Sequence, residues 1–290
     1  MSNVRRGIWQ MIFTVALFAM QDGFSRYLAE TYNTLMVVTI RYWVFSAFVI
    51  LWAARRPEGF RASVTSSRLP AQILRAVLLV AEICIIVWGY TMIGLIESHA
   101  VFAICPLLIV ALSGPILGEV ISFRRWVAVG AGLIGVIIIL RPGAGVFSWP
   151  ALLPLAAAIL FALYSVLTRL TTKGEANFPA FFWPAVIGAG LMTLIGLPQM
   201  QVIAPADLPY FAAYAALAIL SNWSLQKTYQ TAEASVVQPF AYLQIMFVSG
   251  VGMVFYNEPL ALQVAIGAGV VVAAGLYALT LDREKKLPVD

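Results

Sequence analysis

Charged residues are scarce in this sequence of 290 residues. Only 11% are Asp, Glu, Lys or Arg, whereas soluble domains contain about a quarter. The chain also has one histidine and two cysteines, Cys84 and Cys105, too few for a zinc site or a disulfide scaffold. The phosphate-binding pattern GxxxxGK[ST] is absent as well. No metal, nucleotide or other cofactor is therefore expected.

Hydrophobic residues make up 62% of the chain, and they occur in long blocks. A helix that spans a bilayer needs about 20 mainly apolar residues. The blocks predict ten transmembrane helices in an all-α integral membrane protein, with only short connections. The predicted spans are 7–28, 35–54, 71–93, 97–117, 126–140, 149–168, 178–197, 209–230, 235–256 and 261–281.

The basic residues predict the orientation of these spans. If the N-terminus is cytoplasmic, fifteen of the 18 Lys and Arg residues fall on the inner side, as the positive-inside rule requires. Both termini are then cytoplasmic. The net charge of +5 reflects this distribution, so no nucleic-acid partner is expected. The partners are the lipid bilayer and a small molecule.

The second half of the sequence repeats features of the first. Residues Leu17, Phe18 and Ala19 match Leu160, Phe161 and Ala162, and later matches follow in the same order, among them Gly118 and Glu119 against Asn257 and Glu258. The repeat divides the chain into halves 1–145 and 146–290 that together form one transmembrane domain. Because each half has five spans, the halves must be antiparallel, which is typical of secondary transporters that work by alternating access.

These residues carry a resemblance to a known family. Arg41, Pro106 and the closing Gly118 and Glu119 of the first half, with Glu258 in the second, resemble the ten-helix EamA-type members of the drug/metabolite transporter superfamily. Within it the chain is similar to bacterial YddG-type exporters. The resemblance implies export of amino acids, aromatic and other neutral ones above all, across the bacterial inner membrane. It also implies that some toxic organic compounds are carried.

Charged and titratable side chains inside the membrane are candidates for function. Glu82 lies at the middle of span 71–93, where it either binds a substrate amino group, carries a proton or is a neutral hydrogen-bonded acid. Asp22 and Arg26 are four residues apart and are expected to pair. Arg41 either holds a substrate carboxylate, pairs with an acid or extends to the surface. His99 titrates near neutral pH or serves as a helix-start residue.

Other candidates are amides, aromatics and helix breakers. Substrate-binding candidates are Trp88, Tyr164, Asn222, Trp223, Gln238, Tyr242 and Gln244, and hinge candidates are Pro106, Pro115, Pro184, Pro239, Gly250 and Gly252. Some of the aromatics are also expected to form interfacial belts. Glu119 and Glu258 close helices and are expected to serve the start of the following helix.

The sequence disfavours an enzyme. A serine hydrolase needs a histidine apart from its serine, whereas the only histidine is bonded directly to Ser98. An aspartyl protease needs two facing aspartates, and Asp22 is alone in the spans. The prediction is therefore a transporter without ATP, proton-coupled or facilitative, with a multidrug or lipophilic-cation exporter as the alternative. Two repeats supply the symmetry that smaller relatives obtain by dimerising, so a monomer is expected.

Overall fold

The computed structural model describes residues 3–118, 123–140, 149–172, 177–232, 237 and 240–284. The all-helical prediction is confirmed, since these residues contain helices and no strand. The α-helices are α1 (Asn3–Thr31), α2 (Thr34–Ala54), α3 (Phe60–Val64), α4 (Leu69–Ile93), α5 (Leu95–Phe102), α6 (Cys105–Leu117), α7 (Phe123–Leu140), α8 (Leu152–Thr172), α9 (Asn177–Gly196), α10 (Leu208–Thr231), α12 (Leu243–Tyr256) and α13 (Leu262–Glu284). Three short 3₁₀ helices are η1 (Trp149–Ala151), η2 (Leu197–Gln199) and η3 (Pro205–Asp207).

Five helical stretches among the described residues are long and apolar enough to cross a membrane. They are Thr34–Ala54, Leu69–Ile93, Leu95–Leu117, Trp149–Thr171 and Phe178–Gln199. The other expected spans coincide with α1, α7, α10 and α13, and the span 235–256 is described only in part, mainly as α12. The protein is therefore a multi-pass membrane protein.

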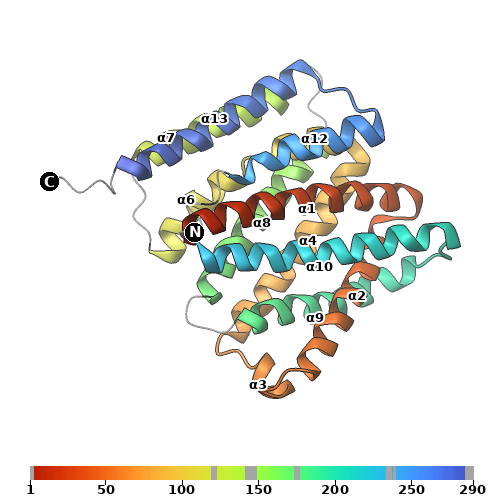
Figure 1. Ribbon diagram of the computed structural model, residues 1–290. Helices are drawn as coiled ribbons and strands as arrows, with labels where there is room; N and C mark the ends of the chain where they lie inside the picture. Colours follow the sequence, from red (N-terminus) through yellow and green to blue (C-terminus); the bar gives the residue numbers. More distant parts are fainter. Residues whose placement is uncertain are drawn as a thin grey trace.

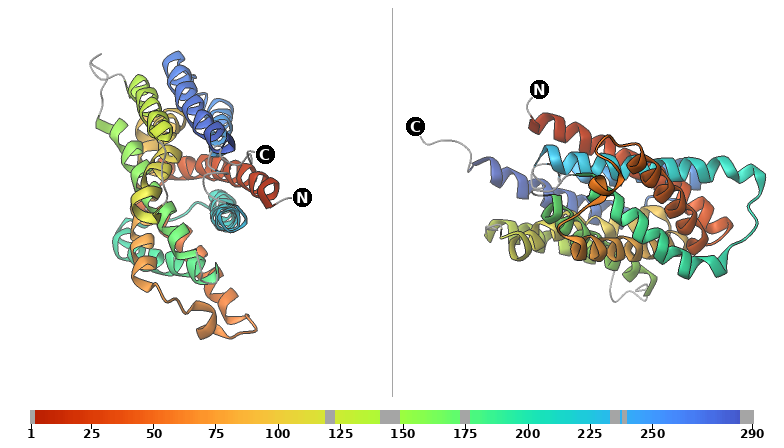
Figure 2. Two further views of the ribbon diagram at one scale, coloured as in Figure 1. Left: turned by 90° about the vertical axis from the view of Figure 1, so that its left-hand side faces the viewer. Right: turned by 90° about the horizontal axis from the view of Figure 1, so that it is seen from below.

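The helices pack between halves in matching pairs (Figure 1). Helix α1 of the first half packs against α10 of the second half. The counterpart of α1 in the second half is α8, and it packs against α4, the first-half counterpart of α10. In the same way, α1 contacts α12 and α8 contacts α6, while α2 lies against α9 and α7 against α13. Each contact is thus exchanged for its counterpart when the two halves are interchanged. Figure 1 and the left view of Figure 2 show the α7–α13 pair at the top of the bundle.

The predicted helix 97–117 is broken in two, at Ala103 and Ile104. Pro106 lies in the first turn of α6, where its missing N–H and fixed φ are tolerated. Gly94 joins α4 to α5 with a φ of 86°, a left-handed value that glycine adopts without strain. α5 is consequently a separate half-helix that begins inside the protein, and its side chains approach the centre of the bundle.

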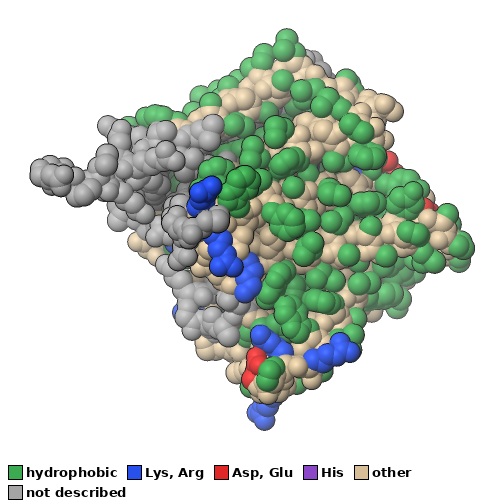
Figure 3. All heavy atoms as spheres, in the orientation of Figure 1, with side chains coloured by type: hydrophobic (Ala, Val, Ile, Leu, Met, Phe, Trp, Pro, Cys, Tyr) green, Lys and Arg blue, Asp and Glu red, His purple; other side chains and the backbone are tan. Residues whose placement is uncertain are grey.

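Buried residues from both halves form the main hydrophobic cluster. It includes Val38 of α2, Leu79 of α4, Tyr164 of α8, Met192 of α9 and Val248 of α12. The outer surface is apolar as well: in Figure 3 hydrophobic side chains are spread over the visible face, whereas Lys and Arg lie near the start of α1 and at the bottom corner by α3. This distribution fits a bundle surrounded by lipid.

Candidate functional site

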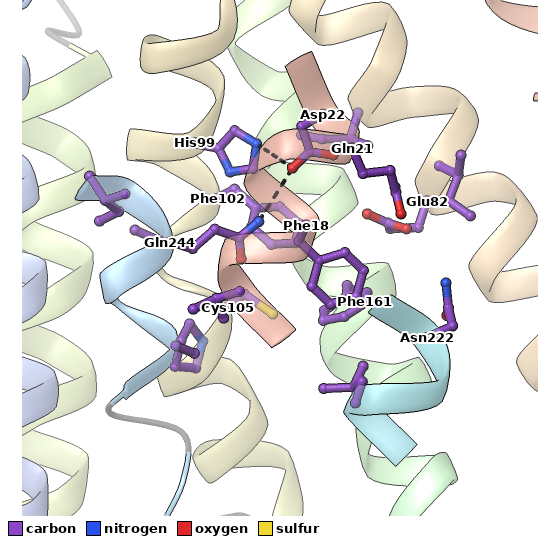
Figure 4. Close-up of a pocket in the computed structure, with 18 of the residues that line it drawn as sticks. Phe18, Gln21, Asp22, Glu82, His99, Phe102, Cys105, Phe161, Asn222 and Gln244 are labelled. Atoms are coloured by element: carbon purple, nitrogen blue, oxygen red, sulfur yellow. Dashed lines mark hydrogen bonds and ion pairs between the residues drawn. The ribbon is translucent and has the colours of Figure 1, made fainter. Parts of the chain in front are cut away.

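A cavity lies at the centre of the bundle, between the two halves. Its walls come from α1, α2, α4, α5 and α6 of the first half and from α8, α10 and α12 of the second. Its volume is about 100 Å³. Figure 4 draws 18 of the lining residues and labels ten of them.

One pole of the cavity is a contact between Asp22 and His99, which lie on helices distant in sequence. The carboxylate of Asp22 on α1 lies 3.1 Å from Nε2 of His99 on α5, and it accepts a hydrogen bond of 3.4 Å from the amide of Gln244 on α12. Nε2 of His99 also lies 2.9 Å from the hydroxyl of Tyr90 on α4. Figure 4 shows this group at one end of the cavity. It connects four helices, three from the first half and one from the second.

A second pole combines Arg41 and Glu82. Both side chains are buried, at 3% and 6% exposure, and they lie close enough to attract each other electrostatically. Nε of Arg41 has no hydrogen-bond partner among the described residues, although its guanidinium lies 5.8 Å from the ring centroids of both Tyr42 and Tyr214. The carboxyl of Glu82 forms no hydrogen bond or direct ion pair with a described residue. Both groups are therefore available to a solute.

Amides separate the two poles. Oε1 of Gln21 accepts a hydrogen bond of 2.8 Å from Ser221, which leaves the NH₂ of Gln21 for a solute or water. Asn222 on α10 is held by a bond of 2.9 Å from its NH₂ to the carbonyl of Ala218, so its own oxygen can accept. Both residues line the cavity.

Aromatic rings form much of the remaining wall. The ring of Phe102 lies 6.0 Å from His99 and 5.7 Å from Phe161. Phe18 and Tyr242 also line the cavity, and the Tyr242 hydroxyl is buried without a hydrogen-bond partner among the described residues. Such rings offer flat apolar surface beside the charged poles, a combination that suits solutes with an aromatic part.

The structure brings together many of the candidates expected from the sequence. Asp22, Arg41, Glu82, His99, Pro106, Asn222, Tyr242 and Gln244 line one cavity. Gln238 and Pro239 lie outside the described residues. Among the other hinge candidates, Pro115 interrupts α6, Pro184 interrupts α9, and Gly250 and Gly252 lie in α12. Their roles in movement stay predictions.

Three aromatic candidates lie away from the cavity lining. Trp88 is 45% exposed on the outer surface and packs edge-on against Trp149 at 5.6 Å, the position of a belt residue. Tyr164 lies under the guanidinium of Arg75, 5.1 Å from its ring centroid. Trp223 packs against Trp52 at 4.8 Å.

Other lining residues were missed by the sequence reasoning. They include Phe18, Gln21, Tyr90, Phe102, Phe161 and Tyr229. A signal was present for Phe18 because it lies four residues before Asp22, on the same helix face. Tyr90 lies eight residues after Glu82 and shares its face in the same way. Phe102 carried no comparable signal, since its placement depends on the break between α5 and α6.

The expected pair of Asp22 and Arg26 is wrong. Arg26 turns away from Asp22, forms an ion pair of 2.8 Å with Glu30 and binds Glu258. Asp22 binds His99 instead. The two residues do share a helix face, but Arg26 pairs with Glu30 on its own helix and with Glu258 from the second half, and Asp22 pairs with His99 on α5.

Comparison with known proteins identifies the family. The model of the EamA-like transporter family matches the chain twice, over residues 5–141 and 148–280. The chain belongs to the EamA-like transporter family. The two matches place one copy of the family unit in each half, and the superfamily expected from the sequence is confirmed.

Three named relatives of this chain are bacterial transporters. The chain is 24% identical over 282 residues to the riboflavin transporter of Vibrio cholerae, which covers 96% of this chain and 94% of the relative. It is 21% identical over 278 residues to the S-adenosylmethionine uptake transporter of Rickettsia prowazekii, with the same coverage. The pseudopaline exporter CntI of Pseudomonas aeruginosa is 25% identical over 235 residues, with 78% of this chain and 80% of the relative covered. These names indicate transport of small molecules across a membrane.

A solved crystal structure shares the fold. It superimposes with a TM-score of 0.68 at 16% sequence identity and covers 98% of this chain and 99% of its own.

Proposed function

We propose that this EamA-like protein is a secondary transporter of amino acids and amino-acid derivatives that have an aromatic or other flat apolar part. The observation that carries the proposal is the pairing of a buried, accessible cation with a buried, accessible anion in one aromatic cavity. Arg41 and Glu82 are those groups, and Phe18, Phe102 and Phe161 form the nearby wall.

The chemistry of a zwitterion matches this arrangement. The planar guanidinium of Arg41 suits a carboxylate, to which it can donate two parallel hydrogen bonds. The carboxyl of Glu82 suits an ammonium group. The amides of Gln21 and Asn222 can bind polar groups of the solute, and the rings accept its side chain. A purely apolar solute would leave both charged groups without partners, at a substantial cost in free energy.

The proposed architecture follows the repeat. Residues 1–145 and 146–290 act as two halves of opposite orientation, with ten spans in all and both termini in the cytoplasm of a bacterial cell. The exchange-symmetric packing of α1 on α10 and of α8 on α4 supports this arrangement. Rocking of the halves around the central cavity would expose the same groups to each side in turn.

The direction of transport in the cell depends on the solute and ion gradients. Export is the direction expected from the YddG-type resemblance, and the Pseudomonas relative is named as an exporter. The Rickettsia relative is named as an uptake transporter. The carrier itself is reversible in this proposal, so the binding chemistry is tested first.

Riboflavin is the second candidate, because the Vibrio relative is named as a riboflavin transporter and aligns with 96% of this chain. The aromatic wall would accept a flavin ring. A neutral flavin, however, makes little use of a cation and an anion held in the same cavity. Loss of either charge should therefore impair amino-acid transport much more than flavin transport.

Solute counterflow into proteoliposomes at equal pH tests the proposal. The panel consists of labelled L-phenylalanine, S-adenosylmethionine, riboflavin and a lipophilic dication, with wild type compared with Arg41→Gln and Glu82→Gln. Saturable phenylalanine counterflow that falls at least about tenfold in both variants, as expected for one lost charged contact, supports the proposal.

A surface pair provides the matched control. Arg56 and Glu58 form an exposed ion pair of 3.2 Å, and Arg56→Gln and Glu58→Gln remove the same charges outside the cavity. They should leave counterflow unchanged. Riboflavin counterflow alone would favour the flavin candidate, whereas dication counterflow alone would favour the multidrug alternative; either result would overturn the amino-acid proposal.

A further inference from the structure

The only histidine of the chain is placed in the cavity, away from the proposed solute pair. His99 is 4% exposed, and its Nε2 lies between the carboxylate of Asp22 at 3.1 Å and the hydroxyl of Tyr90 at 2.9 Å. Gln244 from the other half holds the same Asp22 oxygen. An imidazole, which can accept a proton, thus connects α1 and α5 and, through Asp22, the second half.

The formal charges in the cavity do not balance while His99 is neutral. In the proposed function Glu82 binds the ammonium group as a carboxylate, so Asp22 and Glu82 contribute two negative charges and Arg41 contributes one positive charge. A zwitterionic solute adds no net charge, so one negative charge stays without a counterion among side chains that are buried in the bundle. Such a charge is costly in a membrane. One additional positive charge would remove the imbalance.

We propose that His99 and Asp22 form a proton-binding pair, and that a proton bound there accompanies a zwitterionic solute through the membrane. This inference rests on the proposed function. The proton adds to the free ring nitrogen of His99, the resulting imidazolium pairs with the Asp22 carboxylate, and the proton returns to water when the cavity opens on the other side. No other bond forms or breaks.

The surroundings of His99 single out this pair. On α4 it faces Tyr90, with Glu82 deeper in the same cavity, and α2 contributes Arg41. Glu258, which is bound by Arg26, lies at the N-terminus of α5, and Glu97 is an exposed residue of α5 itself. The surrounding groups from α8, α6 and α12 are Phe161, Cys105, Tyr242 and Gln244. α7 has no charged residue from Trp126 to Leu140, and α13 has none from Leu262 to Leu281. Among the residues that the structure describes, Asp22 is thus the carboxylate in direct contact with the ring.

The charge argument also predicts how a solute with one more positive charge is transported. S-adenosylmethionine has a permanent sulfonium charge in addition to the ammonium and carboxylate of an amino acid. That charge can replace the proton in the balance. Transport of L-phenylalanine should therefore depend on a pH gradient, whereas transport of S-adenosylmethionine should depend on it weakly or not at all.

Accumulation in proteoliposomes tests this proposal. The full-length protein is reconstituted without sodium ions, the membrane voltage is clamped at zero with potassium and valinomycin, and the external pH is about one unit below the internal pH. Coupling to one proton allows up to about tenfold phenylalanine accumulation under these conditions. A pH-sensitive dye trapped inside should report acidification when phenylalanine is added.

His99→Gln is the decisive variant, because glutamine can still donate a hydrogen bond to Asp22 but cannot take up a proton near neutral pH. It should abolish accumulation and dye acidification, and the counterflow that it retains at equal pH should no longer change with pH. Asp22→Asn should behave in the same way. If Asp22→Asn does not fold, His99→Gln alone decides the question, and Arg56→Gln controls for reconstitution.

The outcomes separate this inference from the proposed function. Absence of phenylalanine counterflow in wild type would contradict the proposed function itself. Counterflow without any effect of the pH gradient would overturn the proton inference and leave the proposed function intact. Three other results would overturn the inference as well. They are accumulation when the external pH is above the internal pH, accumulation driven by sodium ions, and accumulation driven by the pH gradient that survives His99→Gln. A parallel loss of counterflow and accumulation in His99→Gln, with a lowered Tm, would reduce His99 to a structural residue.

Discussion

Glu258 at the end of α12 caps the half-helix α5 through the backbone of Ile96. Its Oε2 accepts the N–H of Ile96 at 2.8 Å, and its Oε1 accepts the N–H of Leu95 at the same distance. These are unpaired donors of a helix N-terminus, which favours a negative charge. Arg26 completes the group by pairing with the same carboxylate. One glutamate of the second half therefore fixes the position of α5, which holds His99.

The first prediction concerns this carboxylate. Glu258→Gln removes the charge that compensates Arg26 and weakens the cap on α5, so we expect the free energy of unfolding to fall by about 1–3 kcal/mol. Thermal unfolding in detergent measures the effect. Glu58→Gln is the matched control, because its exposed pair with Arg56 should contribute less than about 1 kcal/mol. Equal losses in the two variants would contradict the structural role of Glu258.

The second prediction concerns Gly94, which lies between α4 and α5 with a φ of 86°. A methyl group there would lie 2.5 Å from Oε1 of Glu258, so alanine must displace the capping carboxylate as well as accept an unfavourable φ. Gly59 has nearly the same φ, 84°, with nothing within 4 Å of an added Cβ. Gly59→Ala should therefore show only the backbone cost of about 1–2 kcal/mol, and Gly94→Ala should lower Tm further. The contact is unimportant if the two variants have the same Tm.

The apolar runs predicted the helices because each run is a property of a single segment of the sequence. Runs of about 20 apolar residues are recognisable without knowing their neighbours, and the order of matches between halves indicated the repeat. Glu82 faces the bundle interior, as its position predicts, since a carboxyl at the middle of a span cannot reach water. Arg75 shows the limit of this reasoning: it was assigned to the inner surface, yet it is fully buried and bonded to Thr168 at 3.0 Å.

Partners on different helices could not be predicted in this way. Spacing of four residues placed Arg26 beside both Asp22 and Glu30, and Arg26 pairs with Glu30. The spacing contains no information about His99 and Glu258, which are the partners of Asp22 and Arg26 from other parts of the chain. Glu258 was expected to serve the following helix, whereas it caps α5 of the other half. That contact depends on the break at Ala103 and Ile104 and on the packing of the halves, which arise only when the bundle assembles.

The third prediction concerns Tyr32, in the turn between α1 and α2. Its hydroxyl donates a hydrogen bond of 2.7 Å to Asp207, and this bond to a carboxylate raises the pKa of Tyr32 above its usual value. A raised tyrosine pKa means that the bond stabilises the fold below about pH 10 and that this contribution is lost as the pH rises through the raised pKa. Tyr32→Phe should therefore lower Tm at neutral pH and lose less Tm than wild type between neutral and strongly alkaline pH. Tyr210→Phe, which removes a hydroxyl not bonded to Asp207, should retain the alkaline decline of wild type.

The fourth prediction separates the two glycine hinge candidates of α12. A Cβ at Gly252 would lie 2.7 Å from Cγ1 of Ile96 and 2.9 Å from Oε2 of Glu258, whereas a Cβ at Gly250 would have nothing within 4 Å. If Gly252 is needed for the close approach of α12 to α5, Gly252→Ala should slow counterflow and lower Tm, while Gly250→Ala should raise Tm slightly through its higher helix propensity. Counterflow and thermal unfolding are measured on the same preparations. Slowed counterflow in Gly250→Ala with an unchanged or raised Tm would instead assign Gly250 to the movement itself, because no contact in the present arrangement could explain that loss.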